Sequence, residues 1–195
     1  RPGRPLANAI SAVLEQGEFD VLILENHGLV VGGKSPEAAM DLQSEVISRL
    51  KQPARPNTRS SNIPRIMDMT KHISGARLPI SPIIHSLATD HWSFHLTQYN
   101  PYCPDHVVFC GVRPWVISAT NPVPSPDNTY GLLPGIGVIL LEKATLAVEA
   151  MLQAQAEVFL RVPEHETIHL LTDSQCSELL DWDAEKYRQS LDRAS

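Results

Sequence analysis

One continuous stretch, residues 21–50, constrains the fold of this chain more than any other part of the sequence. It opens with the apolar run Val21-Leu22-Ile23-Leu24, which is typical of a buried strand. Asn26-His27-Gly28 follows as a bend, and the apolar residues 29–31 predict a second strand that leads away from it. The pattern therefore predicts two strands joined by a short turn, with His27 at that turn.

Helices are predicted on both sides of this pair of strands. Downstream, Ser35 can cap the free amides of a first helical turn, and Pro36 at the next position loses no helical hydrogen bond. The apolar residues that follow recur at intervals of four on one face: Ala38, Leu42, Val46 and Leu50. Upstream, a second amphipathic helix is indicated by Leu6, Ile10, Val13 and Leu14, and it ends at Gly17.

His27 is the candidate metal ligand of this region. It stands at the rigid end of a strand, beside a glycine that leaves room for a ligand. Such a position suits a metal ligand better than a mobile loop does. A histidine that only makes structural hydrogen bonds is the other interpretation of the same position.

The motif around His27 resembles a known family. Leu24-x-Asn26-His27-Gly28-Leu29, followed by Gly33-x-Ser35-Pro36-Glu37-x-Ala39, is similar to the C-terminal half of the class II aldolase/adducin domain. The resemblance covers roughly residues 5 to 50. It implies an α/β fold of mostly antiparallel sheets flanked by helices, and it implies that His27 is the last of the histidines that hold a divalent zinc ion. In the family the other ligands and a catalytic glutamate lie further upstream, so we expect the chain to be a piece of a longer protein.

Two short motifs point to other chemistries. Gly28-x-x-x-x-Gly33-Lys34-Ser35 matches a phosphate-binding loop, but its Leu-Val-Val interior favours a strand, and Pro36 removes an amide where phosphate would bind. His165-Glu166-x-x-His169 matches a zinc-protease motif, which functions within a helix. Pro163 and the β-branched residues 167–168 favour an extended segment instead. A nucleotide binder and a metalloprotease are therefore the less favoured alternatives.

Composition restricts the function classes. The chain has 195 residues, of which 43% are hydrophobic and 19% charged, as is ordinary for a globular protein. A net charge of −6 gives no electrostatic footprint for nucleic acid or for an anionic membrane surface. No apolar run approaches the ~20 residues that span a bilayer. Three cysteines, Cys103, Cys110 and Cys176, show no disulfide framework, which predicts a reducing, cytoplasmic setting.

Residues 52–62 divide the chain. They include no apolar residue able to hold them in a core, and they are rich in proline and asparagine, so they are expected to form a linker. Beyond them, residues 63–73 predict a short helix, and residues 78–84 predict an extended segment interrupted by proline. His91 and His95 are spaced to share a helical face as metal ligands, but Trp92 and Phe94 between them favour a half-buried strand or an irregular segment.

Asp105 and His106 are candidate substrate or pocket residues. Pro104-Asp105-His106 predicts a turn that leads into a buried strand over residues 107–110, ended by Gly111. This arrangement would place His106 at a strand mouth, as His27 is placed. The alternative is that both residues simply cap the turn.

An internal repeat connects the two parts of the sequence. When Gly28 is aligned with Gly137, the strand-forming run at residues 137–140 falls on residues 28–31, and Lys143 falls on Lys34. An amphipathic helix of similar length follows in each copy. The offset of 109 residues is too long for a solenoid period and indicates two related domains. Ile136 stands where the first copy has His27, so the second copy cannot hold a metal in the same way.

The C-terminal part extends the resemblance. Thr172 and Gln175 form a capping-box pattern that predicts a helix. Residues 180–189 resemble the end of the aldolase portion of bifunctional aldolase/short-chain dehydrogenase proteins, which carry Pro-Asp-His-Val and Pro-Gly-x-Gly segments in the same order as residues 104–107 and 134–137 here.

These features together predict an α/β chain with an internal degenerate repeat. Residues 1–51 are expected to be half of a class II aldolase-like domain, and residues 63–195 a second, degenerate one. The resemblance implies metal-dependent aldol cleavage of a sugar phosphate or a related hydroxy-carbonyl compound, in a homo-oligomer, with no nucleic-acid or membrane partner. Since only His27 of the zinc ligands is present, we expect this chain alone to be inactive. The rival hypothesis is a non-catalytic, adducin-like assembly module.

Overall fold

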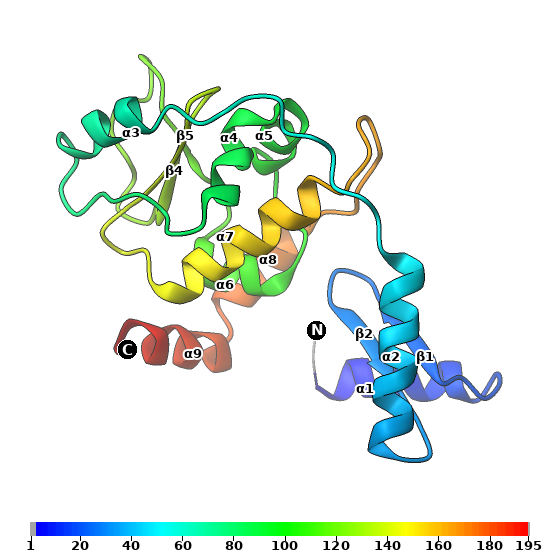
Figure 1. Cartoon of the computed structure of the whole chain (residues 1–195). Coiled ribbons are helices and arrows are strands. Elements are labelled where there is room, and N and C mark those ends of the chain that lie inside the picture. Colours follow the sequence, from blue (N-terminus) through cyan, green and yellow to red (C-terminus); the bar gives the residue numbers. More distant parts are fainter. Residues whose placement is uncertain (1–2, 195) are drawn as a thin grey trace. The chain divides into compact units, whose positions relative to one another are not determined.

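The computed structural model describes residues 3–194 and divides the chain into two compact units, with the boundary after Gln52. We call residues 1–52 unit 1 and residues 53–195 unit 2. Helices and short strands occur in both units, so the expected mixed α/β class is confirmed (Figure 1). Within residues 3–194, no helix is both long enough and apolar enough to cross a membrane.

Unit 1 has the predicted order of helix, hairpin and helix. Its elements are α1 (Arg4–Leu14), β1 (Val21–Leu24), β2 (Gly28–Val31) and α2 (Pro36–Leu50). The strands pair antiparallel, from Val21 opposite Val31 to Leu24 opposite Gly28. As predicted, the Ser35 side chain caps α2, where its Oγ accepts a hydrogen bond from the Ala38 amide at 3.2 Å.

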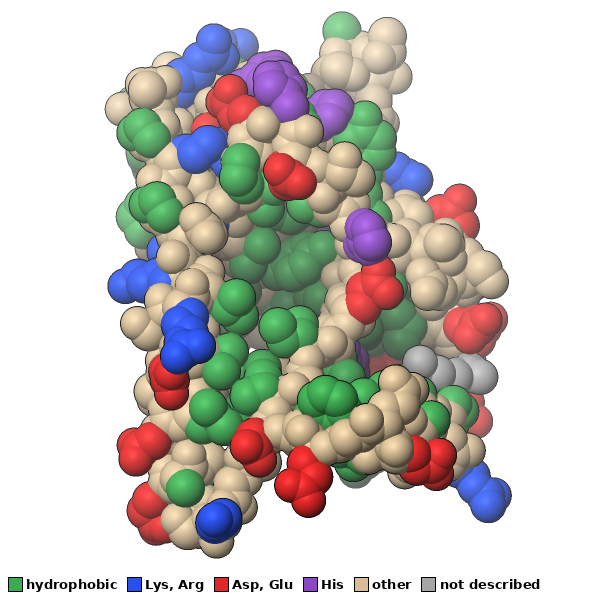
Figure 2. Space-filling model, turned by 90° about the vertical axis from the view of Figure 1, so that its right-hand side faces the viewer, with side chains coloured by type: hydrophobic (Ala, Val, Ile, Leu, Met, Phe, Trp, Pro, Cys, Tyr) green, Lys and Arg blue, Asp and Glu red, His purple; other side chains and the backbone are tan. Residues whose placement is uncertain are grey.

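Unit 1 has no buried core among its described residues. Neither of its helices has a buried residue, and its strand positions are at most half-buried. Ile23 in β1 is 67% exposed and Met40 in α2 is 66% exposed. Other large apolar side chains of the unit are also exposed: Val13, Leu14, Phe19, Val30, Ile47 and Leu50. A space-filling view of one face of the chain shows hydrophobic side chains at the surface among charged ones (Figure 2).

Unit 2 places a three-stranded sheet among helices. The strands are β3 (Trp115–Val116), β4 (Tyr130–Leu133) and β5 (Gly137–Leu140), in the order β3-β4-β5. β4 pairs parallel with β3 and antiparallel with β5. The helical elements are α3 (Ile63–Thr70), η1 (Pro82–His85), α4 (Ser86–Thr89), α5 (His91–Thr97), α6 (Pro104–Cys110), α7 (Leu146–Phe159), α8 (Asp173–Leu180) and α9 (Asp183–Ala194).

The core of unit 2 lies between this sheet and α4, α5 and α7. Side chains of β4, β5 and α7 form its centre, among them Leu132, Val138, Leu140, Leu152 and Phe159. A smaller cluster packs Ile66 of α3 and Trp115 against Ile139. The predicted capping box at Thr172 is confirmed and begins α8, whose Cys176 and Leu179 pack on Val107 of α6.

Two segments of unit 2 differ from the prediction. Residues 107–110 were expected to form a strand, but they belong to helix α6, which starts with Pro104 at its first position and ends at Gly111 with φ +84°. Residues 91–95 were expected to form a half-buried strand or an irregular segment, but they belong to helix α5, which the Asp90 carboxylate caps by accepting a hydrogen bond from the Ser93 amide at 2.8 Å. In both places a helix start and tertiary packing override local strand propensity.

The expected linker is held against unit 2 rather than standing free. Residues 51–62 have no helix or strand. The Arg55 amide donates to the Leu160 carbonyl at 2.7 Å, and the Arg55 guanidinium donates to the Phe159 carbonyl at 3.0 Å. The guanidinium also pairs with Asp90 at 2.7 Å, and both side chains are largely buried. Polar contacts therefore fix a segment that has no apolar anchor.

The glycine bend, the strand and the helix of the predicted repeat are present in both copies, and in each copy the structure pairs that strand with a preceding one to form a hairpin. In each copy two four-residue strands are joined by three residues, and the last strand pair is Leu24–Gly28 in one copy and Leu133–Gly137 in the other. The turns share their backbone form, because Asn26 and Gly135 have φ of +56° and +69°. Their environments differ: all eight strand residues of β4 and β5 are buried, whereas β1 and β2 have none that are.

Candidate functional site

His27 lies at the turn between β1 and β2, as predicted. Its backbone amide donates to the Leu24 carbonyl at 3.1 Å, which closes the turn. The residue is exposed, and a Cβ atom built on the adjacent Gly28 would meet nothing within 4 Å. The turn therefore holds an accessible imidazole beside open space, which fits the role of one metal ligand.

A complete metal site needs more donors than His27. Within the part of the chain that the structure describes, no group of three or more His, Cys, Asp and Glu side chains is placed to hold a metal ion. Structural and catalytic zinc sites use at least three protein ligands.

His106 does not lie at a strand mouth. It belongs to α6, is only 2% exposed, and presents its ring to that of Tyr130 in an edge-to-face contact with 6.3 Å between centroids. Its Nδ1 atom is buried without a hydrogen-bond partner among the described residues. Burial lowers the pKa of His106 to about 4, so the ring is neutral near pH 7.

Asp105 lies next to His106 at the start of α6 but in a different environment. Its carboxylate is exposed and forms an ion pair with Arg188 of α9 at 3.0 Å. The cavity next to α6 is lined from Val107 onward and includes neither Asp105 nor His106. This cavity therefore contains neither residue, and the predicted position of His106 at a strand mouth is wrong because residues 107–110 are helical.

The other histidine motifs have aromatic neighbours. In α5, His95 stacks on Trp92 at 4.9 Å between ring centroids and meets Tyr99 edge-on at 5.1 Å. His165 also contacts Trp92, at 5.4 Å. Residues 165–169 form no helix, as Pro163 and the β-branched residues predicted. Gly28–Val31 is strand β2, as its apolar residues predicted.

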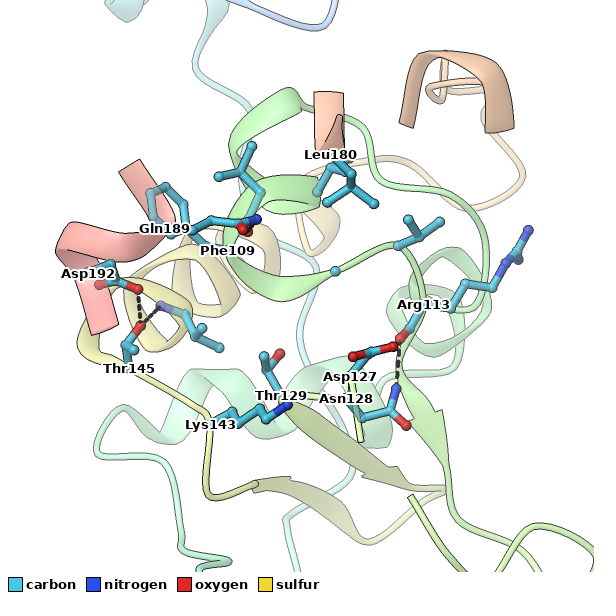
Figure 3. Close-up of a pocket in the computed structure, with 15 residues that line it drawn as sticks. Phe109, Arg113, Asp127, Asn128, Thr129, Lys143, Thr145, Leu180, Gln189 and Asp192 are labelled. Carbon is cyan, nitrogen blue, oxygen red and sulfur yellow. Dashed lines mark hydrogen bonds between the residues drawn. The ribbon is translucent and has the colours of Figure 1, made fainter. Parts of the chain in front are cut away.

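Sequence reasoning missed a cavity in unit 2. It encloses about 430 Å³ between α6, residues 127–129 and the start of α7 (Figure 3). Its polar lining comes from separate parts of the chain: Arg113, Asp127, Asn128, Thr129, Lys143, Thr145, Gln189 and Asp192. Only Lys143 had been singled out, through its alignment with Lys34.

Comparison of the chain with protein-family models, with curated proteins and with solved structures found no match. A functional proposal therefore depends on the motif around His27 and on the geometry described above.

Proposed function

We propose that residues 1–51 form part of a class II aldolase-like domain and that the protein acts in metal-dependent aldol cleavage of a sugar phosphate or a related hydroxy-carbonyl compound. The family motif spans residues 24–39, and the structure forms strand, turn, strand and helix over the same residues. In this proposal His27 is one ligand of a divalent metal, which we take to be zinc.

The observation that carries the proposal is the incomplete packing of unit 1. Residues directly opposite each other in an antiparallel pair share a face of the sheet. One face of the hairpin therefore carries Val21, Ile23, Leu29 and Val31, and the other carries Leu22, Leu24 and Val30. A hairpin that is apolar on both faces needs cover on both. The equivalent hairpin of unit 2 has that cover, since all its strand residues are buried.

The missing cover and the missing metal ligands have one explanation. If further protein packs on both faces of the hairpin, it approaches the turn that carries His27, and it is then positioned to supply the other ligands. A zinc ion bound there would act as a Lewis acid on the substrate carbonyl oxygen. The role of this chain is to hold an imidazole at the turn between β1 and β2, beside a glycine that leaves room for the ion.

Metal content tests the proposal. The protein is expressed from its complete reading frame and analysed by inductively coupled plasma mass spectrometry, as wild type, His27→Ala and His72→Ala. His72 is an exposed histidine of unit 2 and serves as the matched control. We expect zinc to be lost in His27→Ala and retained in His72→Ala. Absence of zinc from the wild type, or equal zinc in both variants, would overturn the assignment.

Activity of the isolated chain gives a second test. Because one imidazole does not make a zinc site, the 195-residue chain by itself is expected to show no aldolase turnover. Measured turnover by that chain would show that the ligand set is complete without further protein, contrary to the proposal.

An adducin-like assembly module is the second candidate function. It is favoured by the same exposed apolar side chains of unit 1, which suit association with other copies in a homo-oligomer. The module predicts stable oligomers in light scattering with no bound metal, whereas the aldolase requires metal. Both candidates are proposed as cytoplasmic, in keeping with the three free cysteines.

A further inference from the structure

The cavity next to α6 has the size of a small-molecule site. Its volume of about 430 Å³ lies within the range of roughly 300–1,000 Å³ that ligand pockets occupy. Apolar side chains form one part of its wall: Val107, Val108, Phe109, Val112, Val148 and Leu180. Every lining residue belongs to unit 2, so the cavity is complete without unit 1.

The polar part of the lining is rich in hydrogen-bond acceptors. The Asp127 carboxylate is exposed and makes no hydrogen bond or ion pair with the described residues, which leaves both its oxygens for a ligand. Asp192 uses one carboxylate oxygen to accept from the Thr145 hydroxyl at 2.6 Å and keeps the other. Gln189 donates its amide to the Val108 carbonyl at 2.7 Å, so its own oxygen is the group left to a ligand.

Donors in the lining are scarce because most are already used. The Thr129 hydroxyl donates to the Cys110 carbonyl at 3.0 Å, and the Asn128 amide donates to the Arg113 carbonyl at 3.3 Å. The Arg113 guanidinium donates to the Gln98 carbonyl at 2.9 Å and extends away from the other side chains drawn in Figure 3. Lys143 donates one hydrogen bond, to the Pro126 carbonyl at 2.7 Å, and an ammonium group has three to give.

These groups select against anionic ligands and leave both acceptors and donors to be satisfied. An anion would face the carboxylates of Asp127 and Asp192, whereas a simple cation would use these carboxylates but leave the remaining donors of the Lys143 ammonium without an acceptor. Hydroxyl groups both donate and accept, so a neutral molecule with several of them can donate to the carboxylates and accept from the lysine. Its carbon skeleton would contact the valine and leucine side chains of the wall.

We propose that this cavity binds a neutral polyhydroxylated molecule of about monosaccharide size, with Asp127 as the main acceptor and Lys143 as the main donor. The proposal does not depend on the aldolase function, because His27 lies in unit 1 and takes no part in the cavity.

Saturation-transfer NMR tests the proposal with a panel of neutral monosaccharides and alditols on the full chain. At least one sugar or alditol of the panel is expected to receive saturation from the protein. Its binding should also shift the backbone amide resonances of residues 128 and 129. Asp127→Asn keeps the side-chain size but replaces an acceptor oxygen by an NH₂ donor, so the affinity should fall about tenfold. Lys143→Met should weaken the same ligand by removing the donor.

Asp68→Asn and Lys71→Met are matched controls, because these residues form an exposed ion pair of unit 2, at 3.3 Å, outside the cavity. Both controls should bind as the wild type does. The proposal is overturned if no neutral member binds, or if Asp127→Asn binds as tightly as Asp68→Asn. Tighter binding of phosphorylated than of neutral sugars would also overturn it, and the zinc measurement on His27 would be unaffected by that result.

Discussion

The Nδ1 atom of His85 accepts a hydrogen bond from the backbone amide of Val138 at 3.1 Å, next to the turn that joins β4 and β5. Gly137 immediately precedes Val138, at the start of β5. A Cβ atom built on Gly137 would lie 2.9 Å from the His85 Nδ1 atom and 2.5 Å from Cδ1 of Ile66. The backbone of Gly137 has a φ of +152°. The position therefore excludes any side chain, on grounds of both backbone conformation and space.

Gly137→Ala is expected to destabilise unit 2 by about 3 kcal/mol, from backbone strain together with overpacking against Ile66 and His85. The measurement is urea unfolding followed by tryptophan fluorescence. This signal reports on unit 2 alone, because all three tryptophans, at positions 92, 115 and 182, belong to it. The unfolding midpoint should fall markedly.

Gly135→Asn provides the control within the same turn. Gly135 has φ +69°, a conformation that asparagine tolerates, and Asn26 takes the equivalent place in the first hairpin at +56°. The nearest atom to a Cβ at this position is Nη1 of Arg59 at 3.8 Å, an ordinary contact. Stability should change by less than about 1 kcal/mol. Equal losses in the two variants would show that the close approach at Gly137 is not the cause.

The first hairpin was predictable because apolar runs on either side of a glycine-containing turn are a local signal. In the second copy the repeat offset identified strand β5 and helix α7, but not strand β4, with which β5 pairs. Helix α6 was not predictable in the same way, since Val107, Val108 and Phe109 favour a strand by propensity. Pro104 at the first helical position and packing of α6 on α7 and α8 decide otherwise, and the packing involves residues far away in the sequence.

The candidate sites, too, were predictable where a local motif forms them and not where residues distant in the sequence come together. The exposed turn that carries His27 is local, so its motif sufficed to place it. The cavity next to α6 combines residues from positions 107 to 192, and no local pattern relates Asp127 to Asp192. His106 was singled out for its neighbours in sequence, but the side of α6 on which it lies decides that it is buried.

Arg55→Ala is expected to release residues 53–62 from the rest of unit 2. It removes the ion pair with Asp90 and the hydrogen bond to the Phe159 carbonyl. Limited trypsin digestion followed by mass spectrometry should show faster cleavage after Arg59. Cleavage after Lys51, which lies outside these contacts, is the internal reference and should keep its rate. If cleavage after Arg59 is unchanged, the polar contacts of Arg55 do not hold the segment.

Stability of unit 2 should depend on pH through His106. Burial lowers the pKa of this ring from 6.5 to about 4, so the unfolded chain binds its proton at a higher pH than the folded chain does. The free energy of unfolding should therefore fall as the pH drops from about 6.5 to 4, by up to about 3 kcal/mol from this ring. His85 adds to the same trend, since burial lowers its pKa too.

Urea unfolding at pH 7 and at pH 4.5 measures this effect. The difference in the free energy of unfolding between the two pH values should be smaller in His106→Leu than in the wild type, whereas the exposed-site control His72→Ala should keep the full difference. An unchanged pH dependence in His106→Leu would mean that this ring is protonated equally easily in both states.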